Sequence, residues 1–364
     1  MARPTVAIID RQALRDNFML AQSLAPDSQS MPMVKANAYG HGALEVCGAL
    51  ADMAPAFGVA CIEEAIALRE AGVKQPILLL EGTFSKDEVA IAAQNDFWLM
   101  VENTNQKEAV LTASIDRPVI VWLGVDTGMH RLGFQPGEIN THFNELKTSN
   151  NVAETMVIAS HFACADDLQS KATDEQLECF DQSVSSLDLS SGHAFSLANS
   201  AGILAWPKSY RNWHRPGYML YGNSPFSVNQ ENADQLKPVM TFESAIISVR
   251  HIAAGESVGY TANWTAQRAS SIATITVGYG DGYPRQAPNG TPVLINGVRC
   301  PLVGRVSMDM ITVDVTDLDS VNIGDKATLW GPQLSVNEVA AFCDTIGYEL
   351  LTRMPARVPR IYIN

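Results

Sequence analysis

The sequence has few basic residues and no long apolar run. Its 364 residues include 25 Lys and Arg against 39 Asp and Glu, which gives a formal net charge of −14. Nucleic-acid-binding proteins neutralise phosphates with clustered Lys and Arg, and no such cluster occurs, so a nucleic-acid partner is excluded. The longest uncharged apolar stretches, Ala54–Ile62 and Pro118–Val125, are far shorter than the roughly 18 residues of a membrane span. No membrane partner is therefore expected.

Cysteine and histidine are present without the spacings that bind metals. The six cysteines form no CxxC pair and the seven histidines form no HxH or HExxH pair, so the sequence predicts no metal site. The first ten residues, MARPTVAIID, lack the apolar segment and small-residue cleavage site of a secretion signal. We therefore expect a cytoplasmic protein with reduced thiols. Hydrophobic residues make up 46% of the chain, which is enough for a large core.

Residues 11–234 alternate between short β-rich runs and amphipathic stretches whose apolar residues recur every three or four positions. The expected strands are Met31–Lys35, Ala56–Ala60, Gln75–Leu80, Phe97–Val101, Pro118–Leu123, Glu154–Ser160, Ala194–Ala198 and Gly217–Tyr221. Alternating strands and helices of this number are typical of a (β/α)8 TIM-type barrel, and an open doubly wound sheet is the competing α/β fold. We predict the barrel.

The pattern changes near residue 235, after which strand-like runs follow one another through Gly, Pro and Asn turns. The expected strands are Val239–Ile252, Ser270–Val277, Thr291–Ile295, Cys300–Val306, Ile311–Val315 and Lys326–Trp330. Only Ser335–Thr345 has a helical pattern. We expect residues 235–364 to form a mostly β domain, joined by an N-terminal strand from residues 1–10.

Polar residues gather at the ends of the expected barrel strands, where the active sites of such barrels lie. In chain order these are Lys35 at the end of the first strand, Asp126 and Arg131 after the fifth, His161 at the end of the sixth, Asn199 and Ser200 after the seventh, and Arg215 at the start of the eighth. Their convergence predicts an active site at this end of the barrel.

Lys35 is the most informative of these residues because it follows the apolar run MPMV. Partial burial lowers the pKa of an ammonium group, and this suits a lysine to act as a nucleophile or to form a Schiff base. An isolated lysine at a strand end more often extends its ammonium group into water. Here Tyr39 and the glycines Gly40 and Gly42 follow, a pattern that suits close approach of a phosphate.

The string MVKANAYGHG at residues 33–42 resembles the pyridoxal-phosphate lysine motif of alanine racemases. Further motifs similar to that family follow in the expected order along the whole chain: VDTGMHRLGF, SHFACADD, NSAG, RPGYMLYG, VGYGDGYPR and GRVSMDM. The resemblance implies an isomerase that interconverts L-alanine and D-alanine and supplies D-alanine for peptidoglycan. It also implies a pyridoxal 5'-phosphate cofactor in a barrel that is followed by a β domain.

The same resemblance assigns roles to individual residues. Lys35 is implied to bind the cofactor and act as one catalytic base, and Tyr260 from the other subunit of a homodimer is implied as the second. The implied cofactor-binding residues are Lys35, Tyr39, His161, Asn199, Ser200, Arg215, Gly217 and Tyr218. The implied substrate-binding residues are Arg131 and, from the partner subunit, Met308, Tyr279 and Asp309.

Two positions depart from the family pattern. Gly124 stands before VDTGM, where the family usually has a carbamylated lysine that positions the arginine corresponding to Arg131. We expect a small anion such as chloride, or an acidic side chain, to replace it. Ala356 stands just before RVPR, where some members have a tyrosine that contacts the phosphate.

Three other functions fit parts of the sequence. The first is another pyridoxal-phosphate enzyme, such as a serine racemase or a decarboxylase, although no GGGxG phosphate loop occurs. The second is a metal-dependent barrel hydrolase that uses His41, His161 and Asp126. The third is a non-catalytic pyridoxal-phosphate carrier, which would be a barrel without the long β domain.

Overall fold

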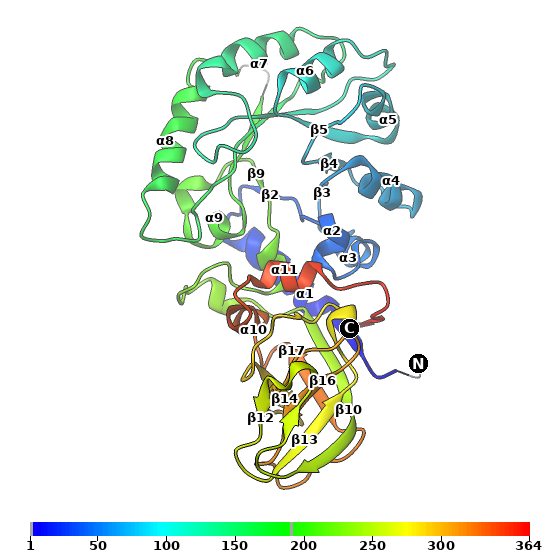
Figure 1. Ribbon diagram of the computed structural model, residues 1–364. Coiled ribbons are helices and arrows are strands. Elements are labelled where there is room, and N and C mark those ends of the chain that lie inside the picture. The colour runs from blue at the N-terminus through cyan, green and yellow to red at the C-terminus, as the bar shows by residue number, and fades with distance from the viewer. Residues whose placement is uncertain (1–2, 190–191) are drawn as a thin grey trace.

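A computed structural model describes residues 3–189 and 192–364, which form a parallel barrel followed by a mainly antiparallel domain (Figure 1). Within the described residues, the barrel sheet has eight strands in the order β2-β9-β8-β7-β6-β5-β4-β3. Their bounds are β2 (Gln29–Ser30), β3 (Phe57–Val59), β4 (Ile77–Leu79), β5 (Phe97–Val101), β6 (Val121–Gly124), β7 (Val157–Ala159), β8 (Ala194–Ser196) and β9 (Trp213–His214). Met33, just past β2, forms a parallel bridge with Gly58 of β3, so the ends of the sheet meet.

Helices on the outside of the barrel connect its strands (Figure 1). Their bounds are α1 (Arg11–Leu24), α2 (Lys35–Tyr39), α3 (Ala43–Leu50), α4 (Ile62–Glu70), α5 (Asp87–Asn95), α6 (Thr104–Leu111), α7 (Ile139–Lys147), α8 (Ala172–Val184) and α9 (Ser200–Ala205). The longer helices follow from apolar spacing: α8 buries Leu177, Phe180 and Val184 at steps of three and four. Helix α1 begins where the Asp10 side chain accepts a hydrogen bond from the Ala13 amide.

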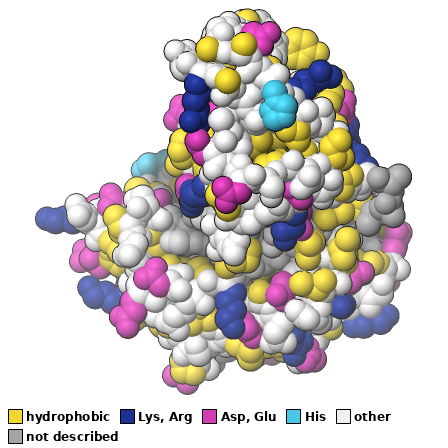
Figure 2. All heavy atoms as spheres, turned by 90° about the horizontal axis from the view of Figure 1, so that it is seen from below, with side chains coloured by type: hydrophobic (Ala, Val, Ile, Leu, Met, Phe, Trp, Pro, Cys, Tyr) yellow, Lys and Arg dark blue, Asp and Glu magenta, His cyan; other side chains and the backbone are white. Residues whose placement is uncertain are grey.

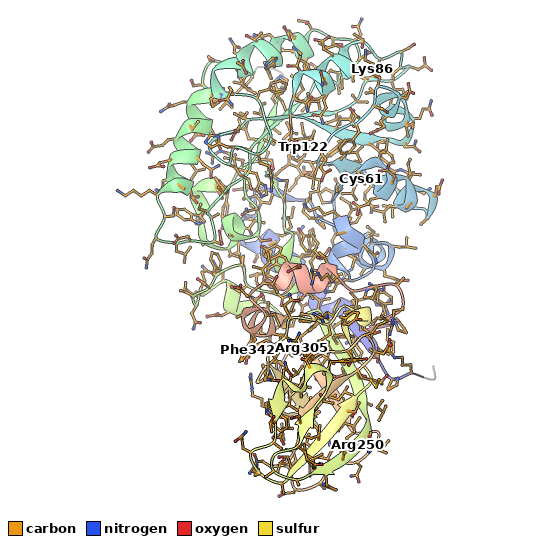
Figure 3. All side chains as sticks on the ribbon, in the orientation of Figure 1. Cys61, Lys86, Trp122, Arg250, Arg305 and Phe342 are labelled. Atoms are coloured by element: carbon orange, nitrogen blue, oxygen red, sulfur yellow. The ribbon has the colours of Figure 1, made fainter. Side chains whose placement is uncertain are left out.

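Three tryptophans fill the interior of the barrel. Trp98 of β5 and Trp122 of β6 are buried, and their ring centroids lie 6.1 Å apart. Trp213 of β9 contacts both rings, at 5.4 and 5.8 Å. Figure 3 shows Trp122 inside the barrel rather than on its outer surface. These large side chains pack against one another and make the barrel interior a packed core.

Two of the expected barrel strands were misplaced. Residues Tyr218–Tyr221 form a 3₁₀ helix, η3, instead of a strand, and the eighth strand is β9. Arg215 therefore follows the eighth strand rather than beginning it. The run YMLY is short and fully buried, so its apolar pattern does not distinguish a helical turn from a strand. This explains the error. The first strand, β2, ends at Ser30, five residues before Lys35.

The chain after residue 239 builds a second sheet on the long strand β10 (Met240–Ile252), which pairs with β1 (Val6–Asp10), β13 (Ser270–Ile275) and β17 (Lys326–Trp330). The other strands are β11 (Ser257–Val258), β12 (Trp264–Thr265), β14 (Pro292–Ile295), β15 (Val298–Pro301), β16 (Ile311–Asp314) and β18 (Arg360–Ile363). The expectation of a single helix here was wrong, because α11 (Gly347–Thr352) follows α10 (Val336–Phe342). In Figure 1 these two helices lie between the barrel and the second sheet.

Strand β1 links the two ends of the chain. It runs antiparallel to β10 and parallel to β18, so the N-terminal and C-terminal strands lie side by side. Seen from below, the molecule has acidic and basic side chains interspersed on the visible face (Figure 2). Among the described residues, no helix is long and apolar enough to cross a bilayer.

Candidate active site

A cavity of about 1530 Å³ opens at the carboxyl ends of the barrel strands. Eleven of the residues singled out in the sequence line it: Lys35, Tyr39, Gly124, Asp126, Arg131, His161, Asn199, Ser200, Arg215, Gly217 and Tyr218. They come from the ends of five different strands and the loops that follow. Tyr260, Tyr279, Met308 and Asp309 do not line this cavity and lie in the second domain of the same chain.

Lys35 reaches the cavity from an unusual turn. The four residues that follow it, Ala36 to Tyr39, all have φ between 51° and 54°, so the chain makes a left-handed helical turn there. This conformation costs about 1–2 kcal/mol per residue and requires support from the rest of the fold. Support comes from Glu64, whose carboxylate accepts a hydrogen bond of 2.6 Å from the Ala36 amide, and from Asn37, whose side chain accepts one of 2.9 Å from the Ala43 amide.

The surroundings of Lys35, burial above all, favour its neutral form. Burial and the nearby Arg131 lower the pKa of Lys35 below its ordinary value, and Arg215 adds to this shift. The carboxylates of Glu81 and Glu64 oppose it. A lysine with a lowered pKa has a larger fraction of nucleophilic amine at neutral pH, which is what Schiff-base formation requires.

Arg215 is buried and held on several sides. Its guanidinium donates to the Ser196 hydroxyl, to the Ser160 carbonyl at 2.5 Å and to the Leu197 carbonyl at 3.3 Å. Burial lowers the pKa of Arg215 to about 10, so the group remains a cation at neutral pH. Its Nη2 lies 3.4 Å from Nδ1 of His161. Burial, and then the charge of Arg215, lower the pKa of His161 to about 3, which leaves that imidazole neutral.

Hydroxyl and amide groups gather at one end of the cavity. The Ser200 hydroxyl accepts hydrogen bonds from the amides of Gly217 at 3.1 Å and Met219 at 3.2 Å. Gly217 is needed at its position because a Cβ there would lie 2.7 Å from the Tyr39 hydroxyl oxygen. Asn199 does not reach this group: its side chain caps helix α9 by accepting from the Gly202 amide at 3.0 Å. The remaining groups have the donor chemistry of a phosphate site.

Arg131 extends into the cavity from a loop that Asp126 organises. The Asp126 carboxylate accepts hydrogen bonds from the amides of Gly128 and His130, at 3.0 and 2.9 Å. The Asp126 and Phe134 backbones also pair, at 3.0 Å, and close the loop at its base. Asp126 thus has a structural part in the loop rather than facing His41, which is buried with its Nδ1 2.9 Å from the Tyr39 carbonyl.

Glu102 and Tyr348 line the cavity but were not identified as site residues from the sequence. Glu102 follows β5, and its carboxyl group packs against Gly124. Tyr348 of α11 stacks on Tyr218, with ring centroids 3.6 Å apart. The position of Glu102 directly after an apolar strand is the signal that had identified Lys35 and His161. Tyr348 gave no such signal, because it comes from a helix of the second domain. Tyr348 thus places a tyrosine at the cavity wall, although position 356, where some family members have a tyrosine, is alanine here.

The residues implied to come from a partner subunit cluster in the second domain. Tyr279 and Gly280 donate amide hydrogen bonds to the carbonyls of Ser307 and Met308, at 3.0 and 2.9 Å. Exposed fractions are 53% for Met308 and 39% for Tyr279. Tyr260 begins a short turn, Tyr260–Ala262, and is 70% exposed. These side chains therefore lie outside the cavity of their own chain, and their exposure makes them available to another molecule.

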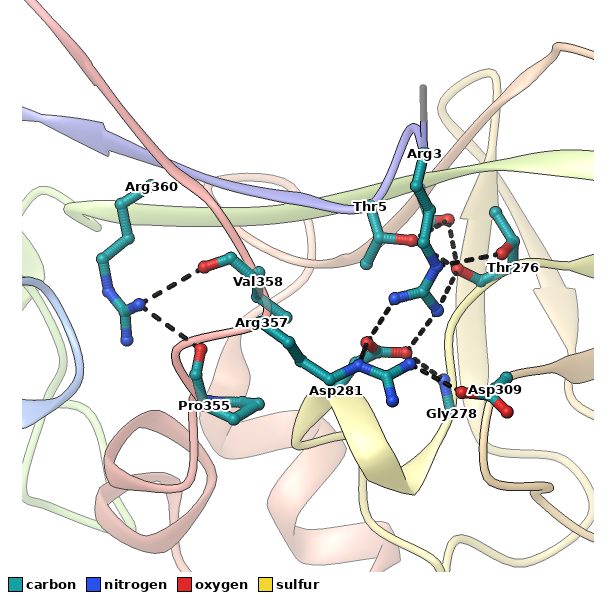
Figure 4. Close-up of polar contacts among 11 residues, drawn as sticks. Arg3, Thr5, Thr276, Gly278, Asp281, Asp309, Pro355, Arg357, Val358 and Arg360 are labelled. Carbon is teal, nitrogen blue, oxygen red and sulfur yellow. Dashed lines mark hydrogen bonds and ion pairs between the residues drawn. The ribbon is translucent and has the colours of Figure 1, made fainter. Parts of the chain in front are cut away.

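A buried carboxylate organises this cluster (Figure 4). Asp281 has no solvent exposure and binds Arg3 through two contacts, of 2.5 and 2.7 Å. It also binds Arg357 at 2.8 Å, which in turn contacts Asp309 at 2.6 Å. Burial raises the pKa of Asp281, but the hydrogen bonds from Arg3 and Gly278 and the two arginine charges hold it below its usual value. The loop that carries Tyr279 is thereby tied to the N-terminus and to the segment before β18.

Family models for the N-terminal and C-terminal domains of alanine racemase match residues 9–225 and 239–362. The chain belongs to the alanine racemase family. The sequence is 49% identical over 360 residues to the biosynthetic alanine racemase of Pseudomonas aeruginosa, and 47% identical to the catabolic enzyme of the same organism. Each match covers 99% of both chains.

Solved structures of alanine racemases agree with the fold. The crystal structure of the biosynthetic enzyme from P. aeruginosa has a TM-score of 0.95 at 48% identity and covers 100% of both chains. The enzyme from Bartonella henselae, described with covalently bound pyridoxal phosphate, has a TM-score of 0.88 at 32% identity and covers 99% of both. The predictions of an alanine racemase, of an isomerase and of a barrel followed by a β domain are confirmed.

The alternative functions lose their support. A carrier protein with a barrel alone does not fit, because both alanine racemase domain models match. Across residues 3–189 and 192–364, no three His, Cys, Asp or Glu side chains gather as metal ligands, and His41 does not line the cavity. The residues of the cavity do fit pyridoxal phosphate: an amine with a lowered pKa, a buried arginine, and a hydroxyl-rich end with donor amides.

Proposed function

We propose that this protein interconverts L-alanine and D-alanine with pyridoxal 5'-phosphate, using Lys35 and Tyr260 as its two bases. The observation that carries the proposal is the position of Lys35, which lines the same cavity as Arg131, Arg215 and the hydroxyl-rich end and has a lowered pKa. When bound, the cofactor withdraws electrons from an amino acid attached to it and makes the α-proton acidic. The protein supplies orientation and proton transfer.

Lys35 would hold the cofactor, and its amine would remove or return the α-proton of the substrate on one face. The Tyr260 hydroxyl of the partner subunit does the same on the opposite face. Arg215 would donate a hydrogen bond to the ring nitrogen of the cofactor, and because its pKa is about 10 it would keep its own proton. His161 lies beside Arg215 as a neutral ring. By donating a hydrogen bond without giving up its proton, Arg215 would limit electron withdrawal by the ring and so limit side reactions.

Tyr39, Ser200 and the backbone of Gly217 and Tyr218 would hold the phosphate, with Asn199 fixing the start of α9. Burial raises the pKa of Tyr39 to about 12, so its hydroxyl stays protonated and can donate to an anion. Arg131 orients the substrate carboxylate. The Met308 amide and the side chains of Tyr279 and Asp309, all from the partner subunit, complete the substrate pocket and its entrance.

A homodimer follows from this assignment, because Tyr260 lies outside the cavity of its own chain. Large apolar side chains are exposed on both parts that would meet. Phe84 and Leu132 line the cavity and are 70% and 48% exposed, and Met308 in the second domain is 53% exposed. Isologous pairing of two chains would cover both sets and complete two identical sites.

The organisation into a barrel domain of residues 11–234 and a β domain of 235–364 with strand 1–10 belongs to the same proposal, as does a cytoplasmic location. All six cysteines are free, which suits a reducing compartment. We propose that the product D-alanine serves peptidoglycan synthesis. The chain is 49% identical to a biosynthetic relative and 47% identical to a catabolic one.

The test is the chirality of the product. Purified protein supplied with pyridoxal phosphate should convert L-alanine to a racemic mixture, and should do so faster than it converts L-serine. Lys35→Ala should lose this activity together with the visible absorbance of the bound cofactor. Retention of that absorbance in Lys35→Ala, or faster turnover of L-serine, would contradict the proposal.

A further inference from the structure

Glu102 lines the cavity, and none of the roles in the proposed reaction involves it. It directly follows β5, next to the end of β6, where Gly124 stands. A Cβ built on Gly124 would lie 2.8 Å from Cγ of Glu102 and 3.2 Å from its Oε1. The Glu102 side chain therefore fills the space that the missing side chain of Gly124 leaves. Its Oε2 is buried and has no hydrogen-bond partner among the described residues.

The backbone around Glu102 is held firmly, so its side chain has a fixed origin. The Glu102 amide donates to Oε1 of Gln106 at 2.9 Å, and Nε2 of Gln106 donates to the Glu81 carbonyl at 2.7 Å. Gln106 is itself buried, at 8% exposure. The ends of β4 and β5 are thereby joined through one side chain. A buried carboxyl group on a rigid backbone, with an unpaired oxygen, is costly unless it faces a charge.

Two arginines provide that charge. Burial raises the pKa of Glu102 to about 7, and the charges of Arg131, after β6, and Arg215, after β9, work against that rise. Glu81, after β4, adds to the rise. Arg215 is already held by Ser196, Ser160 and Leu197. The guanidinium of Arg131, in contrast, has no hydrogen bond within the part of the chain that the structure describes.

We propose that Glu102 is a positioning residue for Arg131, and that Gly124 is glycine because Glu102 needs the space. The carboxylate of Glu102 limits the swing of the Arg131 guanidinium and keeps it aimed at the substrate carboxylate. Glu102 itself does not touch the reacting atoms. This inference rests on the proposed racemase function. It selects an acidic side chain over a bound small anion as the group that compensates for the side chain missing at Gly124.

The first experiment measures alanine racemisation by the holoenzyme with Glu102→Gln, Glu102→Asp and Glu102→Ala. Glu102→Gln should lower kcat/KM for L-alanine by about tenfold or more, mainly through KM, because a misaimed arginine weakens substrate orientation. Glu102→Asp should retain more activity than Glu102→Gln. Formate added to Glu102→Ala should restore part of the activity, since it can replace the lost carboxylate. Glu108→Gln, an exposed glutamate at the same cavity, is the matched control and should behave as wild type.

The second readout is thermal stability, which separates positioning from a structural role. Because the fold raises the pKa of Glu102, its charged form destabilises the folded state above pH 7. Glu102→Gln should therefore raise the Tm of the holoenzyme at such pH values rather than lower it. A purely structural Glu102 would show the opposite: a lower Tm with unchanged kcat/KM in the cofactor-loaded fraction. The acid limb near pH 7 in the wild-type profile of kcat/KM should also disappear in Glu102→Gln.

The third experiment tests the contact with Gly124. Gly124→Ala should push the Glu102 carboxylate aside and lower kcat/KM severalfold, whereas in the Glu102→Ala background the same change should have little effect. Gly48→Ala, where an added Cβ meets nothing within 4 Å, is the control. Additive effects of the two substitutions would overturn the inference. So would wild-type turnover that requires chloride. Inactive wild-type holoenzyme would instead defeat the proposed function itself.

Discussion

The hydroxyl of Tyr362, in the last strand, donates a hydrogen bond of 3.0 Å to the carbonyl of His41. Arg360 of the same strand donates to the Gly40 carbonyl at 2.7 Å. The end of the chain thereby holds the loop that follows Lys35. The fit is close, because a Cβ on Gly42 would lie 2.0 Å from the Tyr362 hydroxyl oxygen. Strand β18 and helix α11 thus add to the support that Glu64 and Asn37 give the left-handed turn after Lys35.

Tyr362→Phe should therefore affect the site from a distance. Loss of one hydrogen bond is expected to lower the free energy of unfolding by about 1 kcal/mol. It should also lower kcat, because the loop that carries Lys35 gains freedom. Tyr210→Phe is the control, since Tyr210 donates a similar hydrogen bond to the Ile203 carbonyl away from Lys35. Urea unfolding and steady-state kinetics of both variants decide the matter. Equal kinetic effects in the two variants would show that β18 does not support the site.

Gly217→Ala should weaken cofactor binding. Its added Cβ would lie 2.7 Å from the Tyr39 hydroxyl oxygen, and Tyr39 cannot move easily because its ring stacks on Tyr221 at 4.9 Å. We expect affinity for pyridoxal phosphate to fall by about tenfold, which corresponds to about 1.4 kcal/mol. Absorbance titration with the cofactor measures this affinity. Gly137→Ala, which meets nothing within 4 Å, should bind the cofactor as wild type does.

Asp281→Asn should destabilise the second domain, because it leaves the charges of Arg3 and Arg357 around a neutral group. Breaking a buried ion pair of this kind costs about 3–5 kcal/mol. Because the pKa of Asp281 is lowered in the folded state, its ionised form contributes to the free energy of unfolding at pH values above the ordinary pKa of an aspartate. This contribution is lost as the pH falls through the lower folded-state pKa. The difference in Tm between wild type and Asp281→Asn should thus shrink on acidification.

Asp317→Asn is the control for this prediction, since Asp317 pairs with Arg268 at the surface and is 81% exposed. Its substitution should change the Tm little at any pH. A difference between wild type and Asp281→Asn that stays constant from neutral to acidic pH would contradict the assignment of the charge on Asp281.

Much of the fold was predictable because its strands are short apolar runs between turns. Strand β5 was placed without error, whereas the buried run YMLY was not, since burial on all sides removes the periodicity that tells a helix from a strand. The site was predictable where chemistry and position coincide, as at Lys35 and His161. The position of Glu102 after β5 offered the same signal, but its relation to Gly124 did not, because Gly124 is a neighbour across the sheet rather than along the chain.

Tyr348 was unpredictable for a different reason. It comes from helix α11 of the second domain, and its contact with Tyr218 joins residues that lie far apart in the sequence. Nothing in the sequence near Tyr348 indicates which barrel loop it will meet. The alanine at position 356 indicates that the family's tyrosine is missing there. Only the packing of α11 against the barrel shows that another tyrosine, Tyr348, lines the cavity.

Subunit mixing tests the shared site most directly. If Lys35 of one subunit works with Tyr260 of the other, a heterodimer of Lys35→Ala and Tyr260→Phe chains has one intact site and one doubly altered site. Random re-pairing of equal amounts makes half of the dimers mixed, so about a quarter of the sites should be intact. Each variant alone should have little activity, and mixing after mild dissociation should restore roughly that fraction of wild-type racemisation. If both bases belonged to one chain, every site would carry one substitution and mixing would restore nothing.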